Sequence, residues 1–475
     1  MKIVLIRPPD PRGGVSILSH AAPMNLGYLA AFFIKKGYSV ELWDYEAEQF
    51  FPESFISRIR DLRPAIIGFS CFTPTIVIGH KLARIVKENF PSIITIVGGP
   101  HSAAFPKGTL EEFPYFDLAA VGEGEETLLE VCRAAENNKG WQGIRGLVWR
   151  SRDGIKEEQR RILIENLDEL PFPSRNLFNL NLKRKGHISR GISNRLRNTQ
   201  IFTSRGCPFA CIFCASKVIN GLRVRLRSPE NVLAEAEECL NKYHFNHIAI
   251  GDDTFTVNQD RAAKICQGLQ KLGVKSWHCE GARVNTVSPE LLKLMVKTGC
   301  KKIVFGVESG SSRILELIKK SITVEQVKNA FKWARQAGFK YIEGTFIIGS
   351  HPSETIQDVK ETVDLIKEIK PDLIAVNWVV PYPGTEVYSL MKEGGYIFTE
   401  DWEKFVMLDR LPLWRTEHFT PEQLMDLQRK ITRSFYLRPD YIIHMLSKIR
   451  NLEEARYWFK TGIEFIKWLI IKRLT

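Results

Sequence analysis

Two series of apolar runs, each run followed by an amphipathic stretch, divide this chain of 475 residues. The first series occupies residues 2 to about 137, with helical stretches expected near 24–36, 74–89 and 125–137. Its expected strands are Lys2–Ile6, Ser39–Trp43, Ala65–Phe69, Ile93–Val97 and Asp117–Val121. Strict alternation of strand and helix predicts an α/β fold, a doubly wound parallel sheet covered by helices on both faces.

A second series begins near residue 200 and contains six expected strands, each followed by a helical segment. These strands are Gln200–Thr203, His247–Ile250, Trp277–Glu280, Lys302–Val307, Tyr341–Ile348 and Leu373–Val379. Six such units predict a partial (β/α)6, TIM-like barrel with its chemistry at the carboxyl ends of the strands. The strand pattern then fades, and residues 420–475 have the pattern of helices.

Four regions follow from this pattern. We expect a first domain over residues 1–140, a hairpin and basic linker over 141–192, the barrel over 193–410 and a helical region over 411–475. The N-terminal MKIVLIRPPD lacks the apolar core of a signal peptide, and no apolar run reaches 18 residues. The expected location is therefore cytoplasmic.

The net charge of +13 is concentrated in one segment. No Asp or Glu occurs between Pro171 and Pro229. The cations there are Arg175, Lys183, Arg184, Lys185, Arg190, Arg195, Arg197, Arg205, Lys217, Arg223, Arg225 and Arg227. They form either a solvated linker or a rim that attracts an anionic substrate. No recognisable nucleic-acid-binding module accompanies them, so we expect no nucleic-acid partner.

Three of the nine cysteines lie together as Cys207-Pro-Phe-Ala-Cys211-Ile-Phe-Cys214, directly after the first strand of the second series. An iron–sulfur cubane normally takes four cysteines. Three at this spacing would leave one iron open to a substrate or cofactor. A structural zinc site is the alternative, but no second pair of ligands is evident downstream.

This C-x3-C-x2-C loop resembles the hallmark of the radical S-adenosylmethionine (SAM) superfamily. The resemblance implies a 4Fe–4S cluster held by the three cysteines, whose open iron chelates SAM and cleaves it to a 5′-deoxyadenosyl radical. Phe213 matches the family's aromatic position beside the adenine. Later strand ends match in order, and by resemblance Asp252, Asp253, Glu308 and Ser309 line the SAM site. The two aspartates depart from the usual glycine-rich form of that loop.

The first domain resembles the Rossmann-like, cobalamin-binding domain found in one branch of this superfamily. The resemblance implies cobalamin contacts at strand ends. The residues are Arg7, Pro8, Ser70, Thr73, Gly98, Gly99, His101, Gly122, Glu123 and Gly124. The D-x-H-x-x-G motif, whose histidine ligates cobalt in many cobalamin proteins, is absent. His101 has a second interpretation, as an ordinary loop residue.

The two-domain resemblance implies a cobalamin-dependent radical SAM enzyme, with methylation of an unactivated carbon as the leading hypothesis. Oxidative ring closure, as in the anaerobic magnesium-protoporphyrin monomethyl ester cyclase, is the alternative. A tRNA methylthiotransferase would need a second cysteine triad, and a non-catalytic sensor would not need an open iron. The expected partners are a small, lipid-like or porphyrin-like substrate and a reductant such as flavodoxin or ferredoxin.

The last segment, residues 452–475, mixes aromatic and aliphatic residues with lysines and arginines. Such a helix is typical either of packing against the barrel or of lying in a membrane interface. The second interpretation predicts peripheral contact with a membrane.

Overall fold

The computed structural model describes residues 1–10, 22–178, 197–406 and 411–471. Its N-terminal domain is built on five parallel strands in the order β2-β1-β3-β4-β5. The strands are β1 (Lys2–Arg7), β2 (Ser39–Asp44), β3 (Ile66–Ser70), β4 (Ile94–Gly98) and β5 (Leu118–Ala120). Along β1, Ile3 and Leu5 face one core, whereas Val4 and Ile6 face another. Apolar side chains on both faces require a cover on each side of the sheet.

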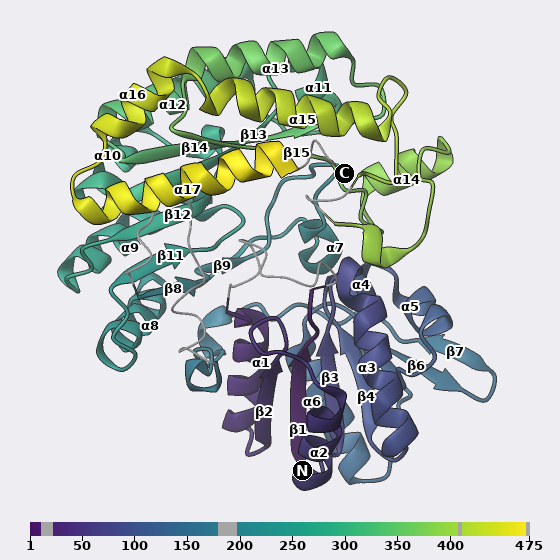
Figure 1. The fold of residues 1–475 in the computed structure, drawn as a ribbon. Coiled ribbons are helices and arrows are strands. Elements are labelled where there is room, and N and C mark those ends of the chain that lie inside the picture. Colours follow the sequence, from purple (N-terminus) through teal and green to yellow (C-terminus); the bar gives the residue numbers. More distant parts are fainter. Residues whose placement is uncertain (11–21, 179–196, 407–410, 472–475) are drawn as a thin grey trace.

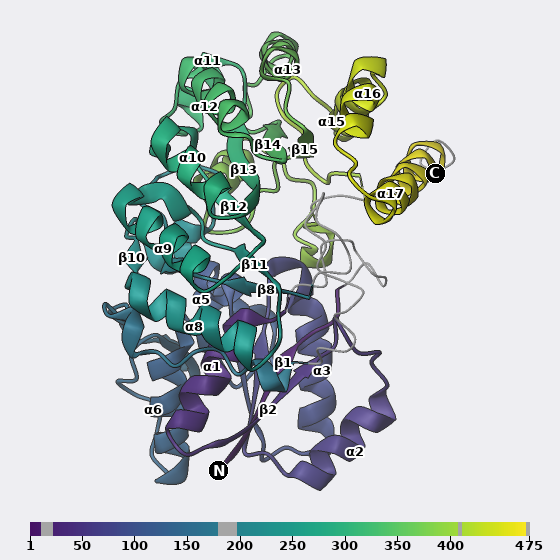
Figure 2. The same ribbon diagram turned by 90° about the vertical axis from the view of Figure 1, so that its left-hand side faces the viewer.

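Helices provide both covers, as predicted (Figures 1 and 2). On one face lie α1 (Met24–Lys35) and α6 (Gly124–Glu136), and on the other α2 (Pro52–Leu62) and α3 (Ile76–Asn89). Two short helices, α4 (Pro100–Ala104) and α5 (Pro106–Glu112), follow β4.

The expected hairpin consists of β6 (Leu147–Ser151) and β7 (Gly154–Glu157). It belongs to the first sheet, because β6 pairs antiparallel with β5 and extends the sheet to seven strands. The first structural unit thus reaches past residue 140. Short-range periodicity detects a hairpin but does not reveal which edge it joins.

The second domain is a six-stranded parallel sheet with the sequential order β15-β14-β13-β12-β11-β8. Its strands are β8 (Asn198–Ile201), β11 (His247–Ile250), β12 (Trp277–Ala282), β13 (Cys300–Glu308), β14 (Tyr341–Ile348) and β15 (Leu373–Trp378). Its helices are α8 (Pro229–Asn241), α9 (Gln259–Lys271), α10 (Pro289–Lys297), α11 (Ser312–Leu317), α12 (Val324–Ala337), α13 (Ile356–Ile369) and α14 (Glu386–Glu393). This is the expected partial barrel.

Between β8 and α8 the chain forms a two-stranded hairpin, β9 (Ser204–Arg205) with β10 (Arg225–Leu226), and the short helix α7 (Ser216–Asn220). After the barrel come three helices, α15 (Pro421–Tyr436), α16 (Pro439–Ser447) and α17 (Leu452–Ile471). Among the described residues, no helix has the length and apolar character needed to cross a membrane.

The carboxyl ends of the two sheets lie close to one another. Gly384, in the loop after β15, is packed so closely that a Cβ there would lie 3.1 Å from the Cβ of Ala104 in α4 and 3.3 Å from Val218 in α7. Helix α4 starts just after β4, and α7 follows β8. Both expected binding edges therefore border one region between the domains.

Candidate active site between the two domains

The cysteine loop leaves β9 through Gly206, which has a φ of +86°. A Cβ at this position would lie 2.2 Å from the carbonyl oxygen of Arg223, so only glycine allows this turn. Farther along the loop, the Ile212 amide donates to Ile318 and the Val387 amide donates to Ile212. The loop is thus held against segments that follow β13 and β15.

The three thiols differ in their surroundings. Cys211 is buried and its Sγ lies 3.7 Å from Nη1 of Arg283, whereas Cys207 Sγ lies 3.6 Å from the hydroxyl of Thr254. Burial raises the pKa of the Cys214 thiol to about 11. Binding iron would require loss of that proton, as for any thiolate ligand.

The described residues contain no group of three His, Cys, Asp or Glu side chains that converge on a single metal ion. A cubane does not need such convergence, because each thiolate binds a different iron. Three cysteines on one short loop, after the first strand of the barrel, fit that ligand set. A mononuclear zinc site would need ligands that converge on one ion, and the described residues contain no such group.

Arg283, at the carboxyl end of β12, is a site residue that the sequence analysis missed. Its guanidinium stacks on Phe209 at 3.6 Å from the ring centroid, contacts Cys211 and donates to the carbonyl of Lys320. It therefore connects the cysteine loop to the segment after β13. The only signal in the sequence was an arginine three residues past the expected strand Trp277–Glu280, because β12 continues to Ala282.

The two predicted SAM-site aspartates are engaged with the chain itself. Asp252 is buried and accepts hydrogen bonds from the Thr203 amide at 2.5 Å and the Ser204 hydroxyl at 2.7 Å. Burial raises its pKa, against the opposing effect of these hydrogen bonds. Asp253 accepts from Ser216 at 2.6 Å. Both carboxylates brace the segments on either side of the cysteine loop.

The other predicted SAM residues lie after β13 and within the loop. Glu308 has a φ of +73°, a strained conformation for a non-glycine residue, and pairs with Lys320 at 2.7 Å while both are buried. Ser309 is buried and its hydroxyl lies 3.2 Å from that of Thr362. Phe213 is partly buried against the barrel core. Their roles toward SAM remain predictions.

At the edge of the first sheet, several predicted cobalamin residues are held by neighbouring side chains. Arg7 pairs with Asp44 at 2.7 Å and with Glu46 at 3.2 Å. The Ser70 hydroxyl accepts from Asn25 at 2.8 Å. Pro8 is buried beside Arg7.

The glycines there leave the backbone accessible. Gly122 has a φ of +87°, and a Cβ on it would meet no atom within 4 Å. A Cβ on Gly98 would meet only Ala120, and on Gly124 only Leu29. Gly99 has a φ of +106°, and a Cβ on it would lie only 2.7 Å from the Cys71 carbonyl oxygen, so this position requires glycine. Bare backbone at adjacent strand ends fits a bulky ligand such as cobalamin.

His101 is fully buried and its Nδ1 lies 3.3 Å from the hydroxyl of Thr73. Burial lowers the pKa of His101 to about 3, so the ring is neutral at physiological pH. Its Nε2 has no hydrogen-bond partner in the described part of the chain. The ring packs at 5.3 Å from Trp402, so the residue sits in an aromatic cluster rather than in an open loop.

Glu123 links this edge to the cysteine loop. It accepts from Arg205 at 2.6 Å and from Arg225 at 2.8 Å, and Glu125 accepts from Arg205 at 2.7 Å. Burial alone would raise the pKa of Glu123, but the two arginines outweigh it and hold the pKa below its ordinary value. Arg205 precedes Cys207 by two residues. We call Glu123, Glu125, Arg205 and Arg225 the interdomain clamp.

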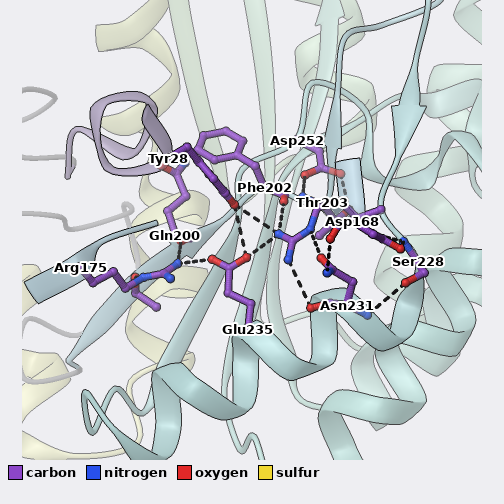
Figure 3. A network of polar contacts seen from close by, with 12 residues as sticks. Tyr28, Asp168, Arg175, Gln200, Phe202, Thr203, Ser228, Asn231, Glu235 and Asp252 are labelled. Carbon is purple, nitrogen blue, oxygen red and sulfur yellow. Dashed lines mark hydrogen bonds and ion pairs between the residues drawn. The ribbon is translucent and has the colours of Figure 1, made fainter. Parts of the chain in front are cut away.

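A second group of ion pairs lies nearby (Figure 3). Glu235 of α8 accepts from Arg175 at 2.5 Å and from Arg227, and all three are buried. Tyr28 of α1 contacts both sides, 3.3 Å from Glu235 and 3.2 Å from Arg227. We call Tyr28, Arg175, Arg227 and Glu235 the buried network.

These pairs change the interpretation of the basic segment. Among its described members, five arginines are paired with glutamates. They are Arg175, Arg205, Arg223, Arg225 and Arg227. They hold the domains and the hairpin together instead of forming a free rim. Lys183, Arg184, Lys185, Arg190 and Arg195 lie outside the described residues.

The comparisons with known proteins agree with this geometry. Residues 201–366 match the family model of the radical SAM superfamily, and residues 14–132 match that of the B12-binding domain. The chain is 33% identical to an uncharacterized methyltransferase of Pyrococcus horikoshii, over 93% of this chain and 94% of that protein. The chain belongs to the cobalamin-binding radical SAM family. This confirms the expected family, enzyme class and cofactors: a 4Fe–4S cluster, SAM and cobalamin.

Two further relatives have known reactions. The chain is 27% identical to cytidylyl-2-hydroxyethylphosphonate methyltransferase of Streptomyces wedmorensis, over 88% of this chain and 86% of that protein. It is 26% identical to the anaerobic magnesium-protoporphyrin IX monomethyl ester cyclase of Cereibacter sphaeroides, over 92% of this chain and 71% of that protein.

The fold also matches a solved structure, the cobalamin-dependent SAM radical enzyme OxsB. The TM-score is 0.77 at 18% identity, with 98% of this chain and 71% of that chain covered. This supports the two-domain α/β architecture with its helical C-terminal region.

Proposed function

We propose that this radical SAM enzyme transfers a methyl group to an unactivated carbon of a small molecule. The observation that carries the proposal is the interdomain clamp. Through Arg205, it joins the loop of Cys207, Cys211 and Cys214 to the glycine-rich edge of the cobalamin-binding domain. A methyltransferase of this kind needs both sites close to one substrate.

When bound, the cluster supplies reductive cleavage of SAM to a 5′-deoxyadenosyl radical, and cobalamin supplies a methyl carrier. The chain supplies position. Arg283 holds the cysteine loop through Phe209 and Cys211, and Asp252 fixes the backbone that leads into it. Lys320 neutralises the buried carboxylate of Glu308 at the end of β13. Gly122 leaves room for a ligand on the opposite edge.

The substrate class is a proposal taken from the relatives. The porphyrin cyclase favours a bulky, porphyrin-like or lipid-like substrate, and the cytidylyl-phosphonate methyltransferase favours an anionic one. The paired arginines no longer support the anionic choice. Peripheral contact with a membrane and reduction by a flavodoxin or ferredoxin also stay proposals, and the former is developed below.

The test is product analysis on enzyme purified without oxygen and supplied with iron, sulfide, cobalamin, SAM and a strong reductant. We expect 5′-deoxyadenosine, and we expect it to fall to background in Cys211→Ala. Cys266→Ala, a buried cysteine of α9, is the matched control and should keep the activity. Equal 5′-deoxyadenosine from both variants would contradict the assigned cluster loop.

S-adenosylhomocysteine distinguishes methyl transfer from oxidation. We expect it to form only when cobalamin is present, because bound cobalamin would supply the carrier through which the methyl group of SAM reaches the substrate. Formation of 5′-deoxyadenosine without any S-adenosylhomocysteine would contradict methyl transfer and favour oxidative ring closure.

A further inference from the structure

The surface of helices α16 and α17 carries an unusual concentration of exposed apolar side chains. Half of the large apolar residues that are exposed in the described part of the chain lie between residues 437 and 466. They are Leu437, Ile442, Ile443, Leu446, Leu452, Phe459, Ile463 and Ile466. Phe459 is 73% exposed and Ile443 68%. Exposed apolar residues gathered in this way mark an interaction site.

Helix α17 has two distinct faces. One face packs on the barrel, where Glu454 pairs with Lys340 at 2.5 Å, Trp458 donates to the Tyr341 hydroxyl at 3.3 Å and Phe465 contacts Tyr436. The inner residues follow a helical spacing of four and seven. This face explains why the helix stays attached to the protein.

The opposite face of α17 points away from the protein. Leu452, Phe459, Ile463 and Ile466 are spaced by seven, four and three residues, which places them in one stripe along the helix. All four are exposed. The stripe therefore has no function in packing against the described part of the chain.

Helix α16 repeats this division. Tyr441 and Met445 are buried, and the Tyr441 hydroxyl donates to the Asp372 carbonyl at 3.0 Å. Ile442, Ile443 and Leu446 are exposed. In Figure 2 both helices lie on the outer side of the barrel.

Cations border the stripe of α17. Arg456, Lys460 and Lys467 are exposed and follow a parallel row, each four or seven residues from the next. Lys467 also forms an exposed pair with Glu464 at 3.1 Å, of the kind that contributes little to stability and can open toward another anion. Between residues 433 and 467 seven lysines and arginines stand against four acidic residues. Protruding apolar side chains beside a row of cations are the features by which an interfacial helix binds anionic lipid.

We propose that the outer faces of α16 and α17 form a docking surface for the anionic headgroup layer of a membrane. The apolar stripe enters the boundary between headgroups and acyl chains, and the bordering cations contact lipid phosphates. This proposal is compatible with a lipid-like or porphyrin-like substrate but does not depend on any turnover, so the two can fail separately.

The experiment is co-sedimentation of the full-length protein with vesicles of phosphatidylglycerol and phosphatidylcholine. The surface variant is Ile443→Ser with Phe459→Ser. The matched control is Ile162→Ser with Ile356→Ser, whose side chains are 69% and 62% exposed but belong to neither α16 nor α17. Unchanged thermal melting would show that both variants are folded.

We expect the wild type and the control to bind vesicles equally, and we expect the affinity of the surface variant to be lower by about tenfold or more. Binding of the wild type should also weaken as salt is added or as phosphatidylglycerol is withdrawn. Equal binding by both variants, or no binding by the wild type, would overturn the proposal. A wild-type dimer that the surface variant converts to a monomer, without vesicle binding, would overturn it in favour of a second copy.

Discussion

Glu354 is a fully buried carboxyl group in the loop after β14, and the active-site interpretation gives it no role. One oxygen accepts from the Ser350 amide at 2.7 Å, and the other has no hydrogen-bond partner among the described residues. Burial raises the pKa of Glu354 from 4.5 to about 8. The folded protein therefore holds this proton at a pH where the unfolded chain has released it.

This makes a prediction about stability and pH. The stabilisation from the protonated carboxyl is complete below about pH 4.5 and is lost as the pH rises toward 8, by up to about 1.4 kcal/mol per pH unit. Glu354→Gln keeps the shape without titrating. Urea unfolding at pH 5 and pH 8 should show the wild type losing stability relative to this variant. Exposed Glu417→Gln is the control, and parallel pH curves for wild type and Glu354→Gln would contradict the argument.

Arg283 makes a second prediction at this scale. Its positive charge lies 3.7 Å from the Cys211 sulfur, so it should favour the reduced, more negative form of a cluster bound there. In Arg283→Gln we expect the reduction potential of the reconstituted cluster to fall, on the order of tens of millivolts. Redox titration followed by electron paramagnetic resonance measures this. Arg283→Lys keeps the charge and should fall less. An unchanged potential in both variants would refute an electrostatic role.

At the scale of elements, the strands were predictable because their apolar runs are local. The expected strand at Tyr341–Ile348 agrees residue for residue, and the cysteine loop follows its expected strand. Helix α2 was not predicted, since only Phe55 and Ile59 of its residues are buried and the rest give a polar pattern. Hydrophobic periodicity detects an element in proportion to the surface it buries.

Ionic contacts between elements were beyond sequence reasoning. Arg205 and Glu123 are separated by 82 positions, and the sequence around either residue does not indicate its partner. From the sequence, the arginines could therefore be interpreted only as a solvated linker or as a basic rim. The glycines and the cysteine loop could be proposed from the sequence because the pattern that suggests a role for them is local backbone and spacing.

The clamp between the β9–β10 hairpin and the start of α6 makes a prediction of its own. Arg205→Gln removes a partner from Glu123 and Glu125, which should loosen the cysteine loop from the cobalamin-binding edge. We expect the ratio of S-adenosylhomocysteine to 5′-deoxyadenosine to fall by about tenfold, because SAM cleavage needs only the barrel. Arg223→Gln breaks an exposed pair with Glu165 and should leave the ratio unchanged. Equal ratios in both variants would show that the clamp does not position the two sites.

At the scale of the whole molecule, the buried network joins three parts of the chain at one carboxylate. Glu235 comes from the barrel domain, Tyr28 from the first domain and Arg175 from the segment between them. Two guanidinium groups and one carboxylate are withdrawn from water together. For a buried ion-pair cluster of this kind, the cost of removing the charges from water offsets much of their mutual attraction. Removing one charge is strongly destabilising, because the others are left buried without compensation.

Glu235→Gln should therefore destabilise the protein by about 3–5 kcal/mol, since Arg175 and Arg227 both lose their charged partner. Glu238→Gln is the control on the same helix, because its partner Lys242 is exposed and this i,i+4 pair is worth about 0.5 kcal/mol or less. Urea unfolding followed by circular dichroism measures both. If the network also unites the domains, Glu235→Gln should unfold in two steps where the wild type unfolds in one. A single transition at the wild-type midpoint would mean that the domains are held by other contacts.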